Sequence, residues 1–246
     1  MSAAAEQLGL LDGADSVVVR RSARARRLAL RVFPHGAVEV VAPLRAGERS
    51  IREFVRSHAG WIAKARGHFR SLHGDGGFAP PAEIRLPALG ERWKIEYADG
   101  PRRLHAERSP DGGQLRVSGP DNDQLRRQQL RAWLKGRARE TLAPWLARVS
   151  AETGLAYHSV TVRRQRSRWG SCSAKHAISL NCALLFLEPP LVRHLMLHEL
   201  AHTRHLDHSR AFWRLVARLD PDYEAAEQRL RAAWSDVPAW VSYDSA

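Results

Sequence analysis

The chain has 246 residues, of which 44% are hydrophobic and 26% charged, as in an ordinary globular protein. It has no apolar run near the roughly 20 residues that a membrane span requires, and its two cysteines are too few for a disulfide scaffold. The formal net charge of +13 favours an anionic partner such as a nucleotide or a nucleic acid, although arginines spread along the whole chain are also typical of a solvated surface.

Residues 1–15 show neither a signal-peptide pattern nor a regular apolar period. We therefore predict a disordered lead-in and, with only two cysteines, a cytoplasmic protein with no membrane partner.

Residues 16–118 are predicted to form a β-rich region with one helix. Apolar and polar residues alternate over 16–43, with a turn signal at Pro34-His35-Gly36, and they alternate again over 83–118. Between these stretches, apolar residues recur at helical spacing over 48–66.

The character of the chain changes near Gly119-Pro120, and residues 119–236 are predicted to form a second domain, followed by a tail at 237–246. A long helical pattern begins near 121–124 and continues to about 152. Further elements follow in this order: strands over 159–163 and 178–187, then helices over 190–205, 210–219 and 221–234. The predicted fold class is α+β.

His198, Glu199 and His202 form a motif with a direct chemical meaning. Residues four apart on a helix lie one turn apart on the same face, so the two imidazoles can bind the same ion. A zinc ion lowers the pKa of its water towards neutrality, and Glu199 can take the proton. The motif predicts a zinc-dependent hydrolase that uses a zinc-bound water activated by Glu199; the alternative is a core helix with hydrogen-bonded histidines.

A catalytic zinc ion usually has three protein ligands, so the motif needs a third. His208 is the candidate, because it lies in a short polar break between two helical patterns, where the chain can turn back. His205 at the predicted helix end and His194 one turn before His198 remain alternatives.

Several segments around this motif resemble the YgjP-like metallopeptidase family, which belongs to the zincin-like superfamily. The resemblance covers roughly residues 16–235. The segments that carry it are Val40-Val41-Ala42-Pro43, Trp61-Ile62, Arg168-Trp169-Gly170-Ser171-Cys172-Ser173, Ile178-Ser179-Leu180-Asn181, Pro189, the histidine motif itself, His208-Ser209 and Phe212-Trp213.

The resemblance implies a small β-rich N-terminal region followed by a zincin-like metallopeptidase domain with an HExxH active-site helix. It implies one catalytic zinc ion bound by His198, His202 and His208, with Glu199 as the general base. It also implies a peptide or protein substrate, and a strand near 178–184 that flanks the cleft as an edge strand to which a peptide could pair.

Substrate binding is assigned to residues of the matching segments that precede the motif. These are Arg168, Trp169, Ser171 and Asn181.

Basic residues between His158 and Asn181 leave other functions open, because no acidic residue accompanies them. They are Arg163, Arg164, Arg166, Arg168 and Lys175. As an anion-binding rim, they would favour metal-dependent hydrolysis of nucleotide phosphoanhydrides, of the nucleoside triphosphate pyrophosphatase type; as a solvated turn, they have no such role. A basic, DNA-associated protein with a little-used metal site is a third hypothesis. The sequence does not indicate an oligomeric state.

Overall fold

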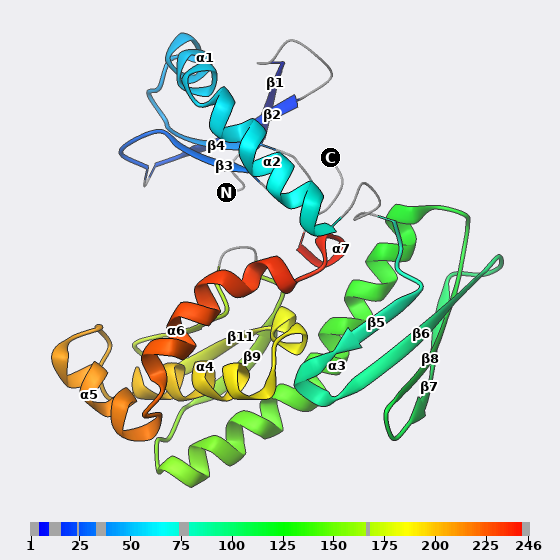
Figure 1. The fold of residues 1–246 in the computed structure, drawn as a ribbon, viewed down its shortest axis with the longest axis vertical. Coiled ribbons are helices and arrows are strands. Elements are labelled where there is room, and N and C mark those ends of the chain that lie inside the picture. The colour runs from blue at the N-terminus through cyan, green and yellow to red at the C-terminus, as the bar shows by residue number, and fades with distance from the viewer. Residues whose placement is uncertain are drawn as a thin grey trace. The chain divides into compact units, whose positions relative to one another are not determined.

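The computed structural model describes residues 5–9, 16–23, 25–32, 38–73, 79–165 and 168–242 (Figure 1). It combines sheets with helices, which confirms the predicted α+β class. The chain divides into two compact units, Met1–Phe78 and Ala79–Ala246. Among the described residues, no helix is both long and apolar enough to cross a membrane.

The first unit is a four-stranded sheet with two helices. Its strands are β1 (Ala5–Gly9), β2 (Ser16–Ser22), β3 (Ala29–Val32) and β4 (Val38–Pro43), in the order β1-β2-β4-β3. Alternate residues of β2 and β4 point into a core completed by the helices, as the period of two predicts; this core includes Val17, Val19, Val38, Val40, Ile51, Val55 and Ile62. Strand β1 lies in the stretch predicted to be a disordered lead-in, and the turn at 34–36 falls outside the described residues.

The single helix predicted over 48–66 is two helices, α1 (Glu48–Ser57) and α2 (Ala59–His73), which meet at His58. The Ser57 hydroxyl and the His58 imidazole both hydrogen-bond to the carbonyl oxygen of Phe54, at 2.9 and 2.8 Å. Such side-chain bonds compete with the helical backbone bonds, and they explain why the helix ends here although the apolar spacing continues.

The second unit begins with another four-stranded sheet, which packs on a long helix. The strands are β5 (Glu83–Leu86), β6 (Glu91–Ala98), β7 (Arg103–Ser109) and β8 (Gly112–Ser118), in the order β5-β6-β8-β7, with a 3₁₀ turn η1 (Pro87–Leu89) after β5. Helix α3 (Asp123–Thr153) follows, capped by Asn122, whose side chain accepts a hydrogen bond from the backbone N–H of Leu125 at 3.0 Å.

The division of the chain at Phe78–Ala79 differs from the predicted boundary at 118/119. Residues of the β5–β8 sheet, such as Trp93 and Leu115, share one hydrophobic core with Leu130 and Leu134 of α3. The strands therefore belong with the helix that follows them. The predicted tail also contributes to this core through Val237 and Trp240.

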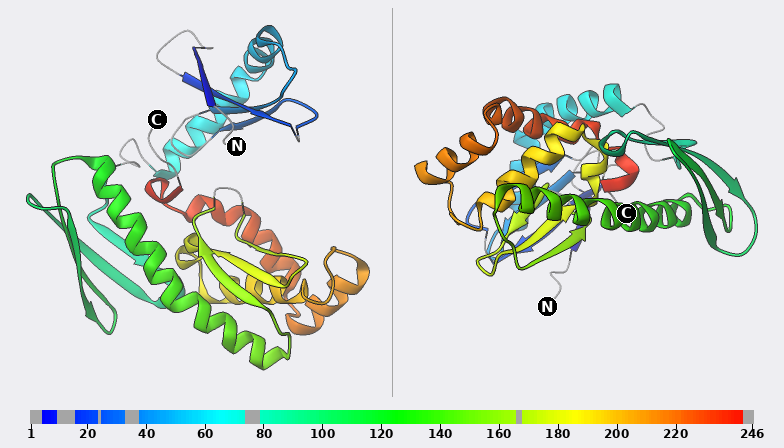
Figure 2. Two further views of the ribbon diagram at one scale, coloured as in Figure 1. Left: turned by 180° about the vertical axis from the view of Figure 1, so that it is seen from behind. Right: turned by 90° about the horizontal axis from the view of Figure 1, so that it is seen from below.

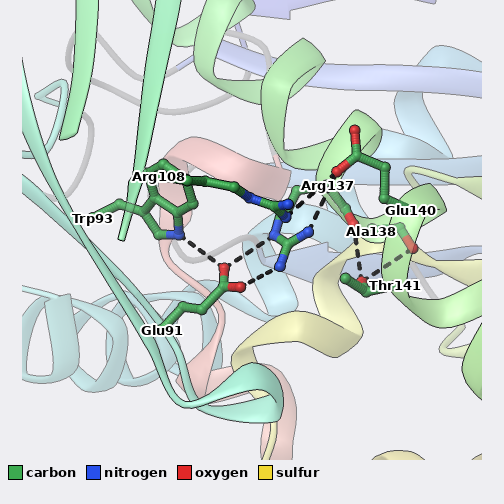
Figure 3. A network of polar contacts seen from close by, with 7 residues as sticks. All are labelled: Glu91, Trp93, Arg108, Arg137, Ala138, Glu140 and Thr141. Atoms are coloured by element: carbon green, nitrogen blue, oxygen red, sulfur yellow. Dashed lines mark hydrogen bonds and ion pairs between the residues drawn. The ribbon is translucent and has the colours of Figure 1, made fainter. Parts of the chain in front are cut away.

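A mostly buried ion pair links α3 to the sheet (Figure 3). Arg137 of α3 contacts both carboxylate oxygens of Glu91 on β6, and the two side chains are only 12% and 11% exposed. The Trp93 indole donates a further hydrogen bond to Glu91 at 2.9 Å, while Glu140 pairs with Arg137 and Arg108 at the rim.

The two four-stranded sheets have the same topology. In each, the second and fourth strands pair in parallel at the centre, and the first and third strands pair antiparallel at the two edges. In each unit, a helix follows the fourth strand.

The rest of the second unit is a small sheet covered by helices. The strands β9 (Ser159–Arg163), β10 (Gly170–Cys172) and β11 (Ala177–Asn181) pair in the order β10-β11-β9. The following elements are η2 (Cys182–Phe186), α4 (Pro189–Ala201), α5 (Arg210–Leu219), α6 (Tyr223–Ala232), η3 (Ala233–Asp236) and α7 (Ala239–Ser242). Figure 1 and the left panel of Figure 2, which are opposite views, show α4 and α6 on one face of this sheet.

The strand expected to flank the cleft at an edge is central instead. β11 pairs in parallel with β9 on one side and antiparallel with β10 on the other. The edge strand on this side of the sheet is β10, which includes Gly170 and Ser171.

Candidate metal centre

The histidine motif lies at the C-terminal end of helix α4, most of whose residues are buried in the hydrophobic core. Proline in its first turn suits a helix start, and its apolar residues are buried on all sides. His198 and His202 lie one turn apart with ring centroids 5.0 Å apart. The helix ends at Ala201, and its last turn is tightened by a 3.0 Å hydrogen bond from the backbone N–H of Thr203 to the Leu200 carbonyl.

His208 returns to the two helix histidines, as the break in the helical pattern predicts. Its Nε2 atom lies 3.1 Å from Nε2 of His198. One ring nitrogen from each of His198, His202 and His208 falls within 4.8 Å of the other two. Ser209 then caps α5 through a 3.5 Å hydrogen bond from the backbone N–H of Phe212, which starts the next helix directly after His208.

The ring nitrogens in this cluster fit a metal ion. The Nδ1 atom of His202 donates to the backbone carbonyl of His205 at 3.0 Å, which leaves Nε2 with its lone pair. Nitrogen ligands about 2.0 Å from a tetrahedral zinc ion lie about 3.3 Å apart, close to the His198–His208 separation. His205 therefore contributes to this cluster through its backbone oxygen, which accepts the hydrogen bond from His202. The His205 ring belongs to neither group of described residues that could hold a metal ion.

Two of these histidines are held neutral. Burial lowers the pKa of His202, and the neighbouring His198 and His208 lower it further against the opposing hydrogen bond to His205. Burial and the neighbouring His198 also lower the pKa of His208. Neutral imidazole is the form that binds a metal ion.

Glu199 is a buried carboxylic acid beside this cluster. Only 5% of the residue is exposed, and its Oε2 atom has no hydrogen-bond partner among the described residues. Burial raises the pKa of Glu199 to about 8, against the opposing charge of Arg168. A shifted carboxyl group in such a place is typical of a functional site.

Gly170 explains how the Arg168–Cys172 segment and the motif fit together. A Cβ atom at position 170 would lie 2.6 Å from Oε1 of Glu199 and 2.9 Å from its carboxyl carbon. Only glycine lets the edge strand β10 approach the carboxylate this closely.

A second set of charged residues, which the sequence analysis missed, supports His198 from behind. Oε1 of Glu227 on α6 lies 2.9 Å from Nδ1 of His198 and 3.3 Å from Nε2 of His194. The Glu227–His198 contact is short but not linear, and Nδ1 has no hydrogen-bond partner in the described part of the chain. Contacts with His194 and then His198 hold the pKa of Glu227 well below its usual range.

His194 is occupied at both ring nitrogens. Its Nδ1 atom lies 2.6 Å from Oδ2 of Asp220, and its Nε2 atom contacts Glu227. Burial lowers the pKa of His194, but hydrogen bonds to Glu227 and Asp220 outweigh that effect and raise it overall. Although His194, His198 and Glu227 also lie close enough to hold an ion, an imidazole that donates from both nitrogens has no lone pair to offer.

The four residues assigned to substrate binding have different environments. Trp169 is 7% exposed, stacks on Trp234 with ring centroids 4.0 Å apart, and donates to the Leu230 carbonyl at 3.0 Å. Asn181 is fully buried; its amide donates to the carbonyls of Gln165 and Arg168, and its oxygen caps η2. Both side chains are therefore buried and hold the loop that carries Arg168, and their assignment to substrate binding stays a prediction.

Arg168 and Ser171 remain accessible. Arg168 is exposed and its charge acts on Glu199, while Ser171 lies half-buried on the edge strand β10. Of the predicted basic rim, Arg164 donates to the Val241 carbonyl at 3.2 Å. Arg166 lies outside the described residues, so the rim stays a prediction.

Comparison with known proteins identifies the family of this chain. The family model described as YgjP-like, metallopeptidase domain, matches residues 26–233. Among solved structures, the chain is similar to the metallopeptidase zymogen abylysin of Pyrococcus abyssi, with 26% identity over 37% of this chain and 93% of that chain and a TM-score of 0.35. No curated protein matches the chain.

Proposed function

Because the chain belongs to the YgjP-like metallopeptidase family, we propose that it is a zinc-dependent peptidase with its active site at the C-terminal end of α4. Its metal ligands are His198, His202 and His208, and its general base is Glu199. The observation that carries this proposal is the convergence of three ring nitrogens beside a buried carboxylate whose Oε2 atom has no partner among the described residues.

The three-histidine donor set favours a catalytic zinc ion over a structural one. A structural zinc ion normally has four protein ligands, whereas a catalytic one keeps a position open for water or substrate. Neither Cys172 nor Cys182 belongs to a described group that could hold a metal ion. When bound, zinc supplies Lewis-acid activation of water and of the scissile carbonyl.

Glu199 performs the proton transfers. Its burial makes it a stronger base than an exposed carboxylate, with a pKa of about 8, so it takes a proton from the attacking water and delivers it to the leaving amine. Gly170 keeps the space beside this carboxylate free. Arg168 contributes a positive charge that offsets the cost of ionising a buried acid.

The edge strand β10 supports a peptide as the substrate. In the described part of the chain, β10 pairs on one side with β11, and its residue Gly170 lies against Glu199. An extended peptide that adds to the free edge would run past the carboxylate. A nucleotide would need the basic rim, of which Arg164 already donates to the Val241 carbonyl at 3.2 Å.

The Glu199→Gln variant tests this function. The amide keeps the size of the side chain but cannot take a proton, so the variant is expected to bind zinc like the wild type and to lose turnover. Zinc content and hydrolysis of an unfolded polypeptide are measured on the same preparations. Turnover at the wild-type rate would remove Glu199 as the base.

A further inference from the structure

The second nitrogen of His198 faces a carboxylate that belongs to a different helix. Nε2 of His198 points towards His208, at 3.1 Å, and Nδ1 lies 2.9 Å from Oε1 of Glu227 on α6. The two side chains are 13% and 20% exposed, so this contact is largely withdrawn from water. A neutral imidazole carries its proton on one nitrogen, and the partner of that nitrogen decides which one.

Glu227 is itself held from the other side. The same Oε1 atom lies 3.3 Å from Nε2 of His194, a side chain that is 1% exposed. Nδ1 of His194 in turn lies 2.6 Å from Oδ2 of Asp220, at the end of α5. The chain of contacts from Asp220 through His194 and Glu227 to His198 links α5, α4 and α6.

We propose that Glu227 is the positioning residue of the metal centre: its carboxylate keeps the proton of His198 on Nδ1 and turns Nε2 towards His202 and His208, while the His194–Asp220 pair fixes the carboxylate. This inference rests on the metal site of the proposed function and adds a residue to it. Carboxylates behind metal-binding histidines orient the ring and raise its basicity, and their loss commonly weakens metal binding by about 10- to 100-fold.

His202 has a comparable arrangement. Its Nδ1 atom donates to the backbone carbonyl of His205 at 3.0 Å, and we assign the same role to Glu227, whose Oε1 atom lies 2.9 Å from Nδ1 of His198. A carbonyl needs no further support, whereas a flexible glutamate does. The buried His194–Asp220 pair supplies that support.

Zinc affinity measured against a chelator of known strength tests the proposal. Glu227→Gln keeps the shape of the side chain and removes its charge, and Glu227→Leu removes both the charge and the acceptor. We expect the zinc Kd to rise about tenfold in the first variant and towards 100-fold in the second. Glu224→Gln, an exposed glutamate one turn earlier on α6, is the matched control and should change the Kd less than twofold.

A second measurement on zinc-free protein separates positioning from a general effect on folding. Long-range ¹H–¹⁵N correlation spectra report which ring nitrogen of His198 carries the proton. The wild type should show Nδ1 protonated, and Glu227→Leu should populate the Nε2-protonated form. If Glu227→Leu does not fold, Glu227→Gln carries the test alone.

Unchanged zinc affinity and an unchanged His198 tautomer in the Glu227 variants would overturn the proposal. His208→Ala, measured in parallel, distinguishes the two levels. If it loses zinc while the Glu227 variants keep theirs, only the role of Glu227 fails; if it also keeps its zinc, the metal site itself is misplaced and the inference fails with it.

Discussion

The surroundings of the two ring nitrogens distinguish the histidines proposed as metal ligands from His194. One nitrogen of His202 donates to a carbonyl, and one nitrogen of His198 lies 2.9 Å from a carboxylate; the other nitrogen of each ring is left for the cluster with His208. His194 faces carboxylates with both nitrogens. The sequence left His194 open as a ligand because it lies on the same helical face, and the positions of Asp220 and Glu227 argue against that role.

Removal of single histidines tests this division. We predict that His208→Ala reduces bound zinc from about one ion per chain to a minor fraction, because two ligands on one helix hold zinc poorly. His194→Ala should retain stoichiometric zinc, since neither of its nitrogens faces the ion. Metal analysis of the two purified variants after dialysis checks both, and equal loss from both would refute the ligand assignment.

Gly170→Ala should impair catalysis without removing the metal. The new methyl group would fall 2.6 Å from Oε1 of Glu199, closer than Cβ atoms come to any neighbour, so the carboxylate must move. A misplacement of about 1 Å in an active site can cost about 100-fold in rate. Gly136→Ala is the control, because a Cβ atom there meets nothing within 4 Å. Normal turnover in Gly170→Ala, with zinc bound, would contradict the placement of Glu199.

The two cysteines should be unreactive at neutral pH. Burial raises the pKa of both thiols to about 11, and the charge of Glu199 adds to the effect at Cys172. Only the thiolate reacts, so at pH 8 about one Cys172 side chain in a thousand is reactive, and the alkylation rate should rise about tenfold per pH unit up to pH 10. Iodoacetamide labelling followed by mass spectrometry checks this, with N-acetylcysteine as the reference; a rate that levels off near pH 8.5 would be the opposite result.

At the residue scale, the histidine motif could be predicted from the sequence, but the contact between Glu227 and His198 could not. The spacing of His198 and His202 is local, so helical geometry alone places them together. Glu227 lies 29 residues after His198, and its role depends on how α6 packs on α4, for which the sequence contains no local signal. The burial of Trp169 and Asn181 was not predictable either, because a motif match does not reveal burial.

At the element scale, one mostly buried ion pair adds to the hydrophobic core that joins α3 to the β5–β8 sheet. We predict that Glu91→Ala destabilises the protein by about 3 kcal/mol, because it leaves Arg137 buried without its main partner. The Trp93 indole also loses its acceptor. Urea unfolding, which does not screen charges, measures the change.

Glu140→Ala is the matched control for this ion pair. Glu140 is 65% exposed and contacts the same arginine at 3.3 Å, so its loss should cost no more than about 0.5 kcal/mol. Equal costs for the two substitutions would mean that the buried pair does not join the helix to the sheet.

Regular periods predicted most helices and strands, and local competition explains the exceptions. Helix α5 has the predicted bounds, and α3 begins and ends within a few residues of them. The break at His58 could not be predicted from apolar spacing, because it results from side chains that hydrogen-bond to the Phe54 carbonyl. The edge position of β10 could not be predicted from apolar spacing either, since strand order within a sheet is set by long-range pairing.

At the scale of the whole molecule, composition and periodicity indicated the α+β class but not the division of the chain. Gly119-Pro120 has the composition of a linker, yet the Gly119 N–H donates to the Ala98 carbonyl at 3.1 Å, and Gln129 of α3 donates to the Ser118 carbonyl at 3.1 Å. The segment is thus a tight connection within one unit. The boundary lies at Phe78–Ala79, next to the glycine- and proline-rich stretch.

The most direct test of the account is hydrolysis by the zinc-loaded protein of an unfolded polypeptide and of nucleoside triphosphates in parallel, with Glu199→Gln as the blank. We predict that new peptide amino termini appear with the wild type, that they are absent with the variant although it binds zinc, and that no phosphate or pyrophosphate is released by either. Release of phosphate or pyrophosphate by the wild type, without peptide cleavage, would contradict the assignment as a peptidase.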